Sequence, residues 1–271
     1  MDIKQHRVPS SLEEVFYIPE FVSEAEEEYL LRKINESSAV KWKTLPNRRL
    51  QIWGGELTNS NVLIPRAMPQ FITEYPDLIR RLRNTGVFSK SKHGEPNHII
   101  VNEYLPGQGI MPHEDGPSYH PVVATLSLGS HAVFHYHRYV EEEEPAQPEI
   151  STSTPDLKGN SRGKPIDLSP VFSLLLEPRS LVITAKSLYT NHLHSIDPIE
   201  RDLFNTDEGS DNDGDGRRRI ANVDMLKDEQ IRRAVKEGGV FERGPRVSLT
   251  CRDVEKVVGG TLKMNGPFGR R

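Results

Sequence analysis

Apolar residues are spaced as in a helix near the N-terminus and as in strands in the later part of the chain. Residues 15–37, VFYIPEFVSEAEEEYLLRKINES, predict a short strand followed by a helix. Ser23 and Glu26 have the spacing of a capping box, which marks the start of this helix. A second helix is predicted over residues 77–85, because a glycine follows it directly as a typical helix stop.

Strand patterns dominate the rest of the chain. Residues 42–57, WKTLPNRRLQIWGGEL, are basic, aromatic and end in glycines, which predicts a β-hairpin. Further along, short apolar or alternating runs are separated by turn residues. The predicted strands are Ile99–Tyr104, Val122–Leu128, Ala132–Tyr139, Phe172–Leu176, Ser180–Thr184 and Val247–Cys251. Many short strands with few helices predict a mainly β (α+β) protein built on a β-sandwich or jelly roll.

Two polar segments interrupt these strands. Residues 141–165 and 206–216 are too polar to bury, and we expect both to be loops. In the second, Asp211, Asp213 and Asp215 alternate as in a calcium-binding loop. The bidentate glutamate of such a loop is missing, so we predict an acidic loop that does not bind calcium.

Composition narrows the class of protein. With 271 residues, a net charge of −4 and 35% hydrophobic residues, the chain fits one large domain or two small ones. Cys251 is the only cysteine, so no internal disulfide forms and a reducing compartment is favoured. The N-terminus lacks a signal-peptide core, and no apolar run reaches about 18 residues. We therefore expect a soluble intracellular protein with no membrane partner. We also expect a monomer that is located in the cytoplasm and nucleus.

His113 and Asp115 follow a turn rich in proline and glycine within residues 102–116, NEYLPGQGIMPHEDG. In an extended segment both side chains share a face, either as part of a metal site or as a surface ion pair. His194 would complete a set of two histidines and one carboxylate, which binds one face of Fe(II) and leaves other positions open. His192 shares the strand face of His194 and is an alternative ligand.

The segment HAVFHYH offers a rival metal site. Together with His194, His135 and His137 would form a cupin-type set. That set leaves the polar residues of the other motifs without a role. We therefore expect these two histidines and His131 to form the polar face of a strand at the rim.

The segment RVSLTCR, residues 246–252, alternates polar and apolar residues. Its polar face carries Arg246, Ser248, Thr250 and Arg252. If this face is exposed, the arginines are simply solvated. If it lines a barrel interior, the arginines need anionic partners, and a dicarboxylate ligand would supply one.

Taken in order, these motifs resemble the AlkB-like Fe(II)/2-oxoglutarate-dependent dioxygenases. The matching residues are Asn102-x-Tyr104, His113-x-Asp115, His194-Ser195-Ile196 and Arg246-x-Ser248-x-Thr250-x-Arg252. The resemblance extends from the N-terminal helix to Arg252. It implies a double-stranded β-helix (jelly roll) with N-terminal helices and a lid hairpin.

The resemblance also implies a cofactor, its co-substrates and their ligands. Fe(II) would be held by His113, Asp115 and His194, with 2-oxoglutarate and O₂ as co-substrates. The residues that would bind 2-oxoglutarate or brace the site are Asn102, Tyr104, Arg246, Ser248, Thr250 and Arg252. The family usually has asparagine in place of Ser248, and the shorter serine weakens any direct contact there.

A three-part organisation follows from the resemblance. Residues 1–98 form an N-terminal extension with helices and the lid, 42–57. Residues 99–256 form the dioxygenase core with the two polar insertions, and 257–271 form a basic C-terminal tail.

The resemblance implies oxidative N-demethylation of methylated RNA or single-stranded DNA. Arg48 and Arg49 would meet phosphate, Trp53 would stack on a base, and Tyr119 would also contact substrate. Alternatively, Trp53 is a core residue of the hairpin and the arginines are solvated. An acidic residue that reads the base in repair enzymes is replaced by Gly116-Pro117. A protein hydroxylase or demethylase, or a nucleic-acid-binding module with little turnover, therefore remain alternatives.

Overall fold

The computed structural model describes residues 1–9, 14–140, 164–204 and 220–259, so most of 141–165 and all of 206–216 lie outside the described residues. The helices are α1 (Glu24–Asn35), α2 (Gln70–Thr73), α3 (Leu78–Asn84), α4 (Lys186–Thr190) and α5 (Glu229–Glu237), with short 3-10 turns at Ile3–His6, Ala39–Lys41 and Val223–Met225. The strands are β1 (Val15–Ile18), β2 (Lys43–Leu45), β3 (Arg48–Trp53), β4 (Gly55–Leu57), β5 (Leu63–Pro65), β6 (His98–Tyr104), β7 (Ile110–His113), β8 (Val122–Leu128), β9 (Ala132–Arg138), β10 (Phe172–Leu176), β11 (Leu181–Ala185), β12 (His192–Ile196), β13 (Arg201–Phe204), β14 (Gly239–Glu242) and β15 (Arg246–Arg252).

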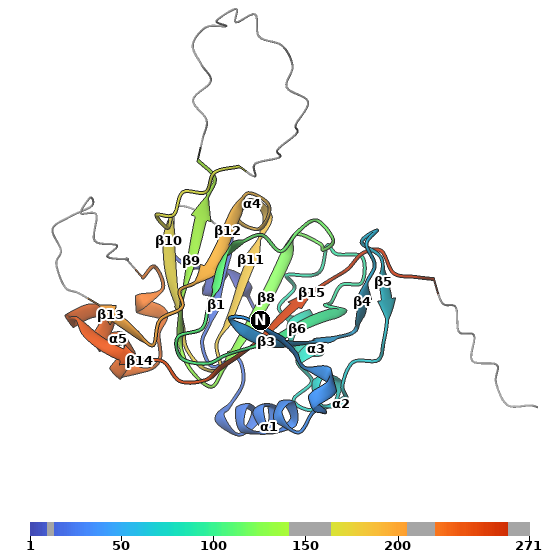
Figure 1. The fold of residues 1–271 in the computed structure, drawn as a ribbon, viewed down its shortest axis with the longest axis horizontal. Helices are drawn as coiled ribbons and strands as arrows, with labels where there is room; N and C mark the ends of the chain where they lie inside the picture. The colour runs from blue at the N-terminus through green and yellow to red at the C-terminus, as the bar shows by residue number, and fades with distance from the viewer. Residues whose placement is uncertain (10–13, 141–163, 205–219, 260–271) are drawn as a thin grey trace, which may run out of the picture.

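Two antiparallel sheets form the framework (Figure 1). The large sheet has the order β1-β11-β8-β15-β6-β3-β2, and the small sheet has the order β10-β9-β12-β7. The two sheets face each other, and Tyr136 of β9 forms a hydrogen bond of 2.6 Å with Thr184 of β11 across the space between them. This arrangement confirms the predicted mainly β jelly roll.

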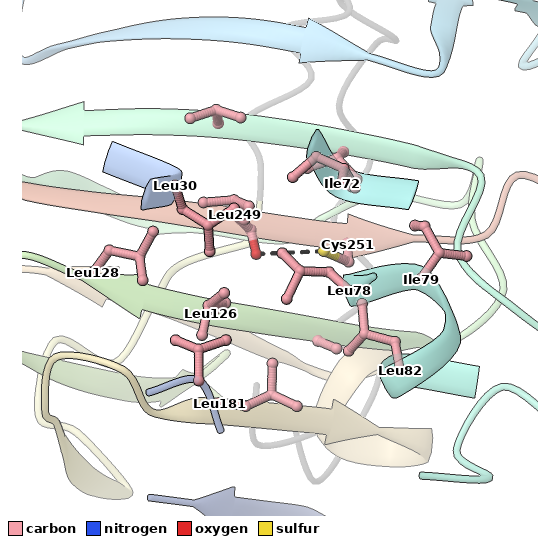
Figure 2. Close-up of a cluster of buried hydrophobic side chains, with 14 of the residues drawn as sticks. Leu30, Ile72, Leu78, Ile79, Leu82, Leu126, Leu128, Leu181, Leu249 and Cys251 are labelled. Carbon is pink, nitrogen blue, oxygen red and sulfur yellow. Dashed lines mark hydrogen bonds between the residues drawn. The ribbon is translucent and has the colours of Figure 1, made fainter. Parts of the chain in front are cut away.

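Helices cover the outer face of the large sheet. In β15, Val247, Leu249 and Cys251 point to this face, as the alternation in the sequence predicted. Figure 2 shows Leu249 and Cys251 beside Leu30 of α1 and Leu78 of α3. Because the apolar residues of β15 are used on this side, its polar residues must face the interior between the sheets.

The two predicted N-terminal helices are present as α1 and α3. Ser23 accepts a hydrogen bond from the backbone of Glu26, whose carboxylate accepts one from the backbone of Ser23, so the capping box is confirmed. Asp77 caps α3, and Gly86 lies just after its end with φ of +77°. Both helices pack their apolar sides onto the large sheet.

The predicted hairpin is formed by β2 and β3, but it is also part of the large sheet. Arg49 of β3 is paired with Glu103 of β6, and β4 then turns away to pair with β5. β1 joins the opposite edge through β11. Strands from the region before residue 98 therefore complete the sheet, while the boundary predicted there stays a prediction.

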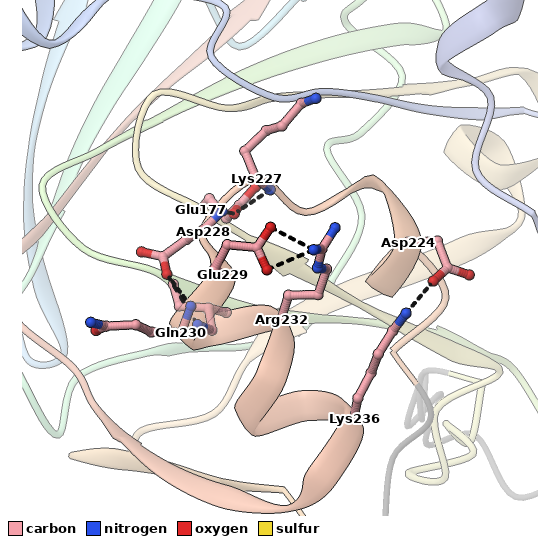
Figure 3. Close-up of polar contacts among 9 residues, drawn as sticks. Glu177, Asp224, Lys227, Asp228, Glu229, Gln230, Arg232 and Lys236 are labelled. Carbon is pink, nitrogen blue, oxygen red and sulfur yellow. Dashed lines mark hydrogen bonds and ion pairs between the residues drawn. The ribbon is translucent and has the colours of Figure 1, made fainter.

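A second apolar cluster lies at the small sheet, where β13, β14 and α5 gather (Figure 1). Buried Glu177 anchors this part: it accepts hydrogen bonds from Tyr17 and from the backbone of Lys227 and Asp228, at 2.6, 2.8 and 2.7 Å. Figure 3 shows the latter two contacts at the start of α5. Within the described residues, no helix is both long and apolar enough to span a membrane.

Candidate metal and co-substrate site

A cavity opens between the inner faces of the two sheets. Its polar wall comes from β6 and β15 of the large sheet, and β7, β9 and β12 of the small sheet form the opposite wall. All of the residues that were expected to hold metal or 2-oxoglutarate line it: Asn102, Tyr104, His113, Asp115, His194, Arg246, Ser248, Thr250 and Arg252. The fold thus gathers residues that lie up to 150 positions apart, from 102 to 252.

His113, Asp115 and His194 form one cluster. Each offers a ligand atom, and these atoms lie within 4.8 Å of one another. β7 and β12 are paired so that His113 lies directly opposite His194. Gly109 allows this pairing, because a Cβ there would lie 2.3 Å from the carbonyl oxygen of Ile196. No other group of three such side chains was found among the described residues.

The orientation and charge of the two histidines suit metal binding. Nδ1 of His113 donates a hydrogen bond of 2.8 Å to the carbonyl of Met111, which leaves Nε2 with its lone pair. His194 is stacked on Phe134, with ring centres 5.2 Å apart. Burial lowers the pKa of His113, and burial together with His113 lowers the pKa of His194 to about 3. Both imidazoles are therefore neutral at pH 7, as metal ligands must be.

Asp115 is held in its charged form by Arg252. Burial alone would raise the pKa of Asp115, but the Arg252 guanidinium outweighs burial, and the pKa lies below its usual range. Nη2 of Arg252 donates to Oδ1 of Asp115, whereas Oδ2 is buried without a partner. A free carboxylate oxygen next to two neutral imidazoles is a donor set that fits Fe(II).

Arg246 lies at the opposite end of β15 and fits a carboxylate. It is 3% exposed and donates one hydrogen bond, from Nη2 to Oγ of Ser127 at 2.8 Å. Its Nε and Nη1 are buried without partners. Burial lowers the pKa of Arg246 to about 10, so the guanidinium stays charged at pH 7. A buried cation with unpaired donors needs an anion, and a keto-dicarboxylate would place one carboxylate here.

The other residues expected at the co-substrate lie between these two ends. Asn102, Ser248 and Thr250 face the cavity, and the ring of Tyr104 lies 5.8 Å from the guanidinium carbon of Arg246. In the paired strands, Ser248 lies next to Asn102. An amide donor is thus present beside the shorter serine.

The histidines around β9 differ from what was expected. His131, His135 and His137 are all buried, at 3%, 1% and 4% exposure, so their expected position at the rim is wrong. None of them lines the cavity. His135 and His137 lie on the other side of β9, where His137 contacts Oγ of Ser195 at 2.9 Å, and His131 precedes β9 and contacts Oδ2 of Asp202 at 3.0 Å. They therefore do not join His194 in a cupin-type set.

His192 does not occupy the position of His194. Its Nδ1 lies 3.3 Å from the carbonyl of Ser187 in α4, and it does not line the cavity. His194 is the residue of β12 that meets His113. The alternative assignment of the second imidazole to His192 thus has no geometric support.

The arginines of the hairpin point to opposite sides of the sheet. Nε of Arg48 donates to Oδ1 of Asn102 at 3.0 Å, which places Arg48 beside the cavity. Arg49 forms two hydrogen bonds to Glu103, at 2.7 and 2.6 Å, and lies over the ring of Trp42. The charge of Arg49 is already paired, so Arg48 is the better placed of the two to meet an anionic ligand.

Trp53 and Tyr119, the other two residues expected to contact substrate, lie in two different environments. Trp53 is 6% exposed, packs edge-on against Phe71 at 5.4 Å and belongs to the core. Its alternative interpretation as a core residue of the hairpin is correct, and stacking on a base would require it to leave the core. Tyr119 lies over Arg252 at 4.9 Å, next to the metal-facing carboxylate. Its contact with substrate stays a prediction.

Phe134 was missed from the sequence. It lines the cavity and fixes the ring plane of His194, at 19° between the two rings. The signal was the alternation within HAVFHYH, where Ala132, Phe134 and Tyr136 form an apolar set opposite the histidines. Of this segment, the apolar residue Phe134 and not the histidines lines the cavity.

The chain is similar to several known proteins. Residues 14–252 match a family model described as the 2OG-Fe(II) oxygenase superfamily. The chain is 34% identical over 262 residues to "Probable RNA/DNA demethylase ALKBH6" of Danio rerio, which covers 97% of this chain and 94% of that protein. It is 31% identical over 142 residues to "tRNA (carboxymethyluridine(34)-5-O)-methyltransferase alkbh8" of Xenopus tropicalis, spanning 49% of this chain and 22% of that protein. The solved structure of OsALKBH1 aligns over 89% of this chain and 98% of that chain, with a TM-score of 0.46 and 15% identity.

Proposed function

The chain belongs to the 2OG-Fe(II) oxygenase superfamily, among its AlkB-like members, and we propose that it oxidatively removes N-methyl groups from RNA or single-stranded DNA. It is a dioxygenase that takes Fe(II), 2-oxoglutarate and O₂. One observation carries the proposal. The cluster of His113, Asp115 and His194 lies in the same cavity as the unpaired guanidinium nitrogens of Arg246.

Fe(II), when bound, would activate O₂, which is the oxidant: 2-oxoglutarate, O₂ and an N-methyl group give succinate, CO₂ and an N-hydroxymethyl group. The N-hydroxymethyl group then breaks down to formaldehyde and leaves an N–H on the substrate. One oxygen atom of O₂ ends in succinate and the other on the methyl carbon. No side chain of this protein has to act as an acid or a base in these reaction steps. Their work is to bind, to orient and to keep water out.

Each end of the cavity has a distinct task. His113, Asp115 and His194 would hold Fe(II), with Arg252 keeping Asp115 charged and oriented. Arg246 would hold the far carboxylate of 2-oxoglutarate through Nε and Nη1. The two sites lie at opposite ends of the cavity, so a molecule with two carboxylates can reach both.

Support for a nucleic-acid substrate comes from the hairpin and from the named relative. The Danio rerio protein is called a probable RNA/DNA demethylase. In the sheet register, Lys43 and Leu50 lie next to each other and beside Asn102, and Arg48 binds Asn102 directly. Ile52 on the same face is 48% exposed. A cationic and apolar surface next to the cavity suits a phosphate and an unstacked base.

A protein substrate is the second candidate, because one expected recognition element is missing. The residue after Asp115 is Gly116, with φ of +86°, and Pro117 follows it. Neither side chain can read the edge of a base. With Trp53 in the core as well, recognition of a base would depend on Arg48 and the apolar residues of β3.

The test is product analysis with matched substrates. Iron-loaded protein is incubated with 2-oxoglutarate, O₂ and methylated oligonucleotides or methylated peptides, and mass spectrometry follows the loss of 14 mass units per methyl group, about the mass of CH₂. We expect demethylated single-stranded RNA or DNA. Demethylated or hydroxylated peptide alone would favour the second candidate. A blank reading for succinate in all samples would favour a binding module.

A matched pair of variants tests the hairpin. Arg48→Ala should weaken binding of single-stranded RNA and reduce its dependence on salt, because one phosphate contact is lost. Arg233→Ala, on the exposed side of α5 where Arg233 pairs with Glu237, removes the same charge far along the chain and should change neither. Equal effects of the two variants would show that only net charge matters.

The location and the oligomeric state of the enzyme are also proposals. We propose a monomer that works in the cytoplasm and nucleus. The one cysteine, Cys251, is buried, and burial raises the pKa of its thiol to about 12, which fits a residue that takes no part in disulfide chemistry. Fractionation of cells and light scattering of the purified protein test these two points.

A further inference from the structure

His98 is a buried histidine that none of the roles described above uses. It is 1% exposed, and neither of its ring nitrogens has a hydrogen-bond partner. Buried polar atoms are nearly always hydrogen-bonded, and one left without a partner lowers stability. An apolar side chain of similar size would avoid that cost. The position therefore calls for an explanation beyond packing.

The neighbour of His98 is the arginine that holds the metal-facing carboxylate. In the pairing of β6 with β15, His98 lies opposite Arg252, and both side chains lie on the inner face of the sheet. The ring of Tyr119 lies over the guanidinium carbon of Arg252 at 4.9 Å, and its centre is 5.7 Å from that of His98. His98, Tyr119 and Arg252 thus form one contiguous group behind Asp115.

The unpaired atoms of this group are complementary. Arg252 uses Nη2 for Asp115, while its Nε and Nη1 are buried donors without partners. Burial and the charge of Arg252 lower the pKa of His98 to about 4, so its ring is neutral at pH 7 and one ring nitrogen is an acceptor. A neutral acceptor and unpaired charged donors are cross-strand neighbours.

We propose that His98 is a positioning residue that accepts a hydrogen bond from Arg252 when a metal ion binds Asp115. The inference rests on the metal site proposed above. A divalent cation at Oδ2 draws charge from the carboxylate, which then holds the Arg252 guanidinium less strongly. The imidazole of His98 offers that guanidinium a second, uncharged anchor. Arg252 stays in place, and Asp115 keeps its orientation toward the metal.

Binding of Mn(II), a stand-in for Fe(II) that does not react with O₂, tests this role without any turnover. Electron paramagnetic resonance measures the affinity of the full chain and three variants. His98→Leu, which has no acceptor, should weaken Mn(II) binding about tenfold, and His98→Gln, which restores one, should stay within about twofold. His120→Phe is the control, because this imidazole pairs with Glu255 at 3.1 Å outside the group.

Two outcomes would overturn the proposal. Equal losses for His98→Leu and His98→Gln would mean that only the shape of the ring matters, and unchanged affinity in both would mean that His98 has no role. If His113→Ala leaves Mn(II) affinity unchanged, the metal site itself is wrong, and that failure is recognisable apart from the role of His98.

A measurement on the unaltered protein covers the case in which the leucine variant does not fold. Histidine labelled with nitrogen-15 is incorporated, and Zn(II), which is diamagnetic, is added. The ring-nitrogen signal of His98, identified by its absence in His98→Gln, should shift as a hydrogen bond from Arg252 forms. A signal that does not move on saturation with Zn(II) would contradict the proposal.

Discussion

Arg252 donates a hydrogen bond to Asp115 from a guanidinium that is 7% exposed to a carboxylate that is 3% exposed. The two residues come from the last core strand and from the loop after β7, so their contact links the two sheets at the metal end of the cavity. Arg252 occupies Oδ1 of the aspartate, and Oδ2 has no partner and can meet a metal.

Arg252→Gln should therefore damage both stability and metal binding. Removing one partner of a buried ion pair costs about 3–5 kcal/mol, because the other charge is left unpaired. Without Arg252, burial raises the pKa of Asp115, so a proton competes with the metal. Mn(II) affinity at pH 7 should fall by about tenfold or more and recover in part as the pH rises. Titrations at several pH values measure this, and a pH-independent loss would contradict the account.

Arg246→Lys should act on the co-substrate and leave the metal alone. Lysine keeps the charge but cannot donate through two fixed nitrogens, so one charge-assisted hydrogen bond to the carboxylate is lost. We expect the affinity of Mn(II)-loaded protein for 2-oxoglutarate to fall by about tenfold or more, with Mn(II) affinity within about twofold of the parent. Calorimetry without O₂ measures both constants. A parallel loss of Mn(II) affinity would contradict the assignment of Arg246 to 2-oxoglutarate alone.

Trp53→Ala should lower the stability of the folded protein. Its effect should come from lost core packing and not from lost contacts with substrate. Trp53 belongs to the core beside Phe71, and truncation of such a residue costs about 3–5 kcal/mol. Chemical denaturation measures the loss of unfolding free energy. Trp53→Leu, which stays apolar but has no ring to stack on a base, should recover part of the stability and bind single-stranded RNA like the parent. Loss of RNA binding in the folded leucine variant would support the stacking role.

Asp202 gives a prediction for acid stability. Burial would raise the pKa of Asp202, but its hydrogen bonds from Arg243 at 2.7 Å and its contact with His131 at 3.0 Å lower it to about 2. A lowered pKa in the folded state stabilises the fold above the unfolded pKa of about 3.9. This contribution, about 2 kcal/mol, is lost as the pH falls through about 2.

The stability difference between the parent and Asp202→Asn measures this contribution. It should be largest above pH 4, shrink between about pH 4 and 2, and approach zero below that range. Urea denaturation at fixed pH values gives the two free energies. A difference that stayed constant down to pH 2 would show that the pKa of Asp202 in the folded protein is not lowered below its unfolded value.

The sequence was most informative where alternation was clean. In β15, polar and apolar residues alternate without exception, and the structure places Arg246 in the cavity and Leu249 in the core. The sequence is compatible with either an exposed or an interior polar face, and only packing distinguishes the two locations. The helices α1 and α3 were predictable for a similar reason, because their start and end signals are local.

The sequence was least informative where a residue's partners come from distant parts of the chain. Trp53 looked like a residue for stacking on a base, because nothing local indicates that Phe71 covers it. The histidines of β9 looked like surface residues, because Ser173 and Ser195, which contact His135 and His137, lie on other strands. No local sequence pattern marks His98 as a site residue, since its proposed role depends on Arg252 in the paired strand.

The most direct test of the metal site is the stoichiometry and affinity of Mn(II) binding in the parent, His194→Ala and His192→Ala. We expect one Mn(II) per chain, a loss of affinity of about tenfold or more in His194→Ala, and no change in His192→Ala. Binding that survives removal of His194, or that depends on His192, would contradict this expectation.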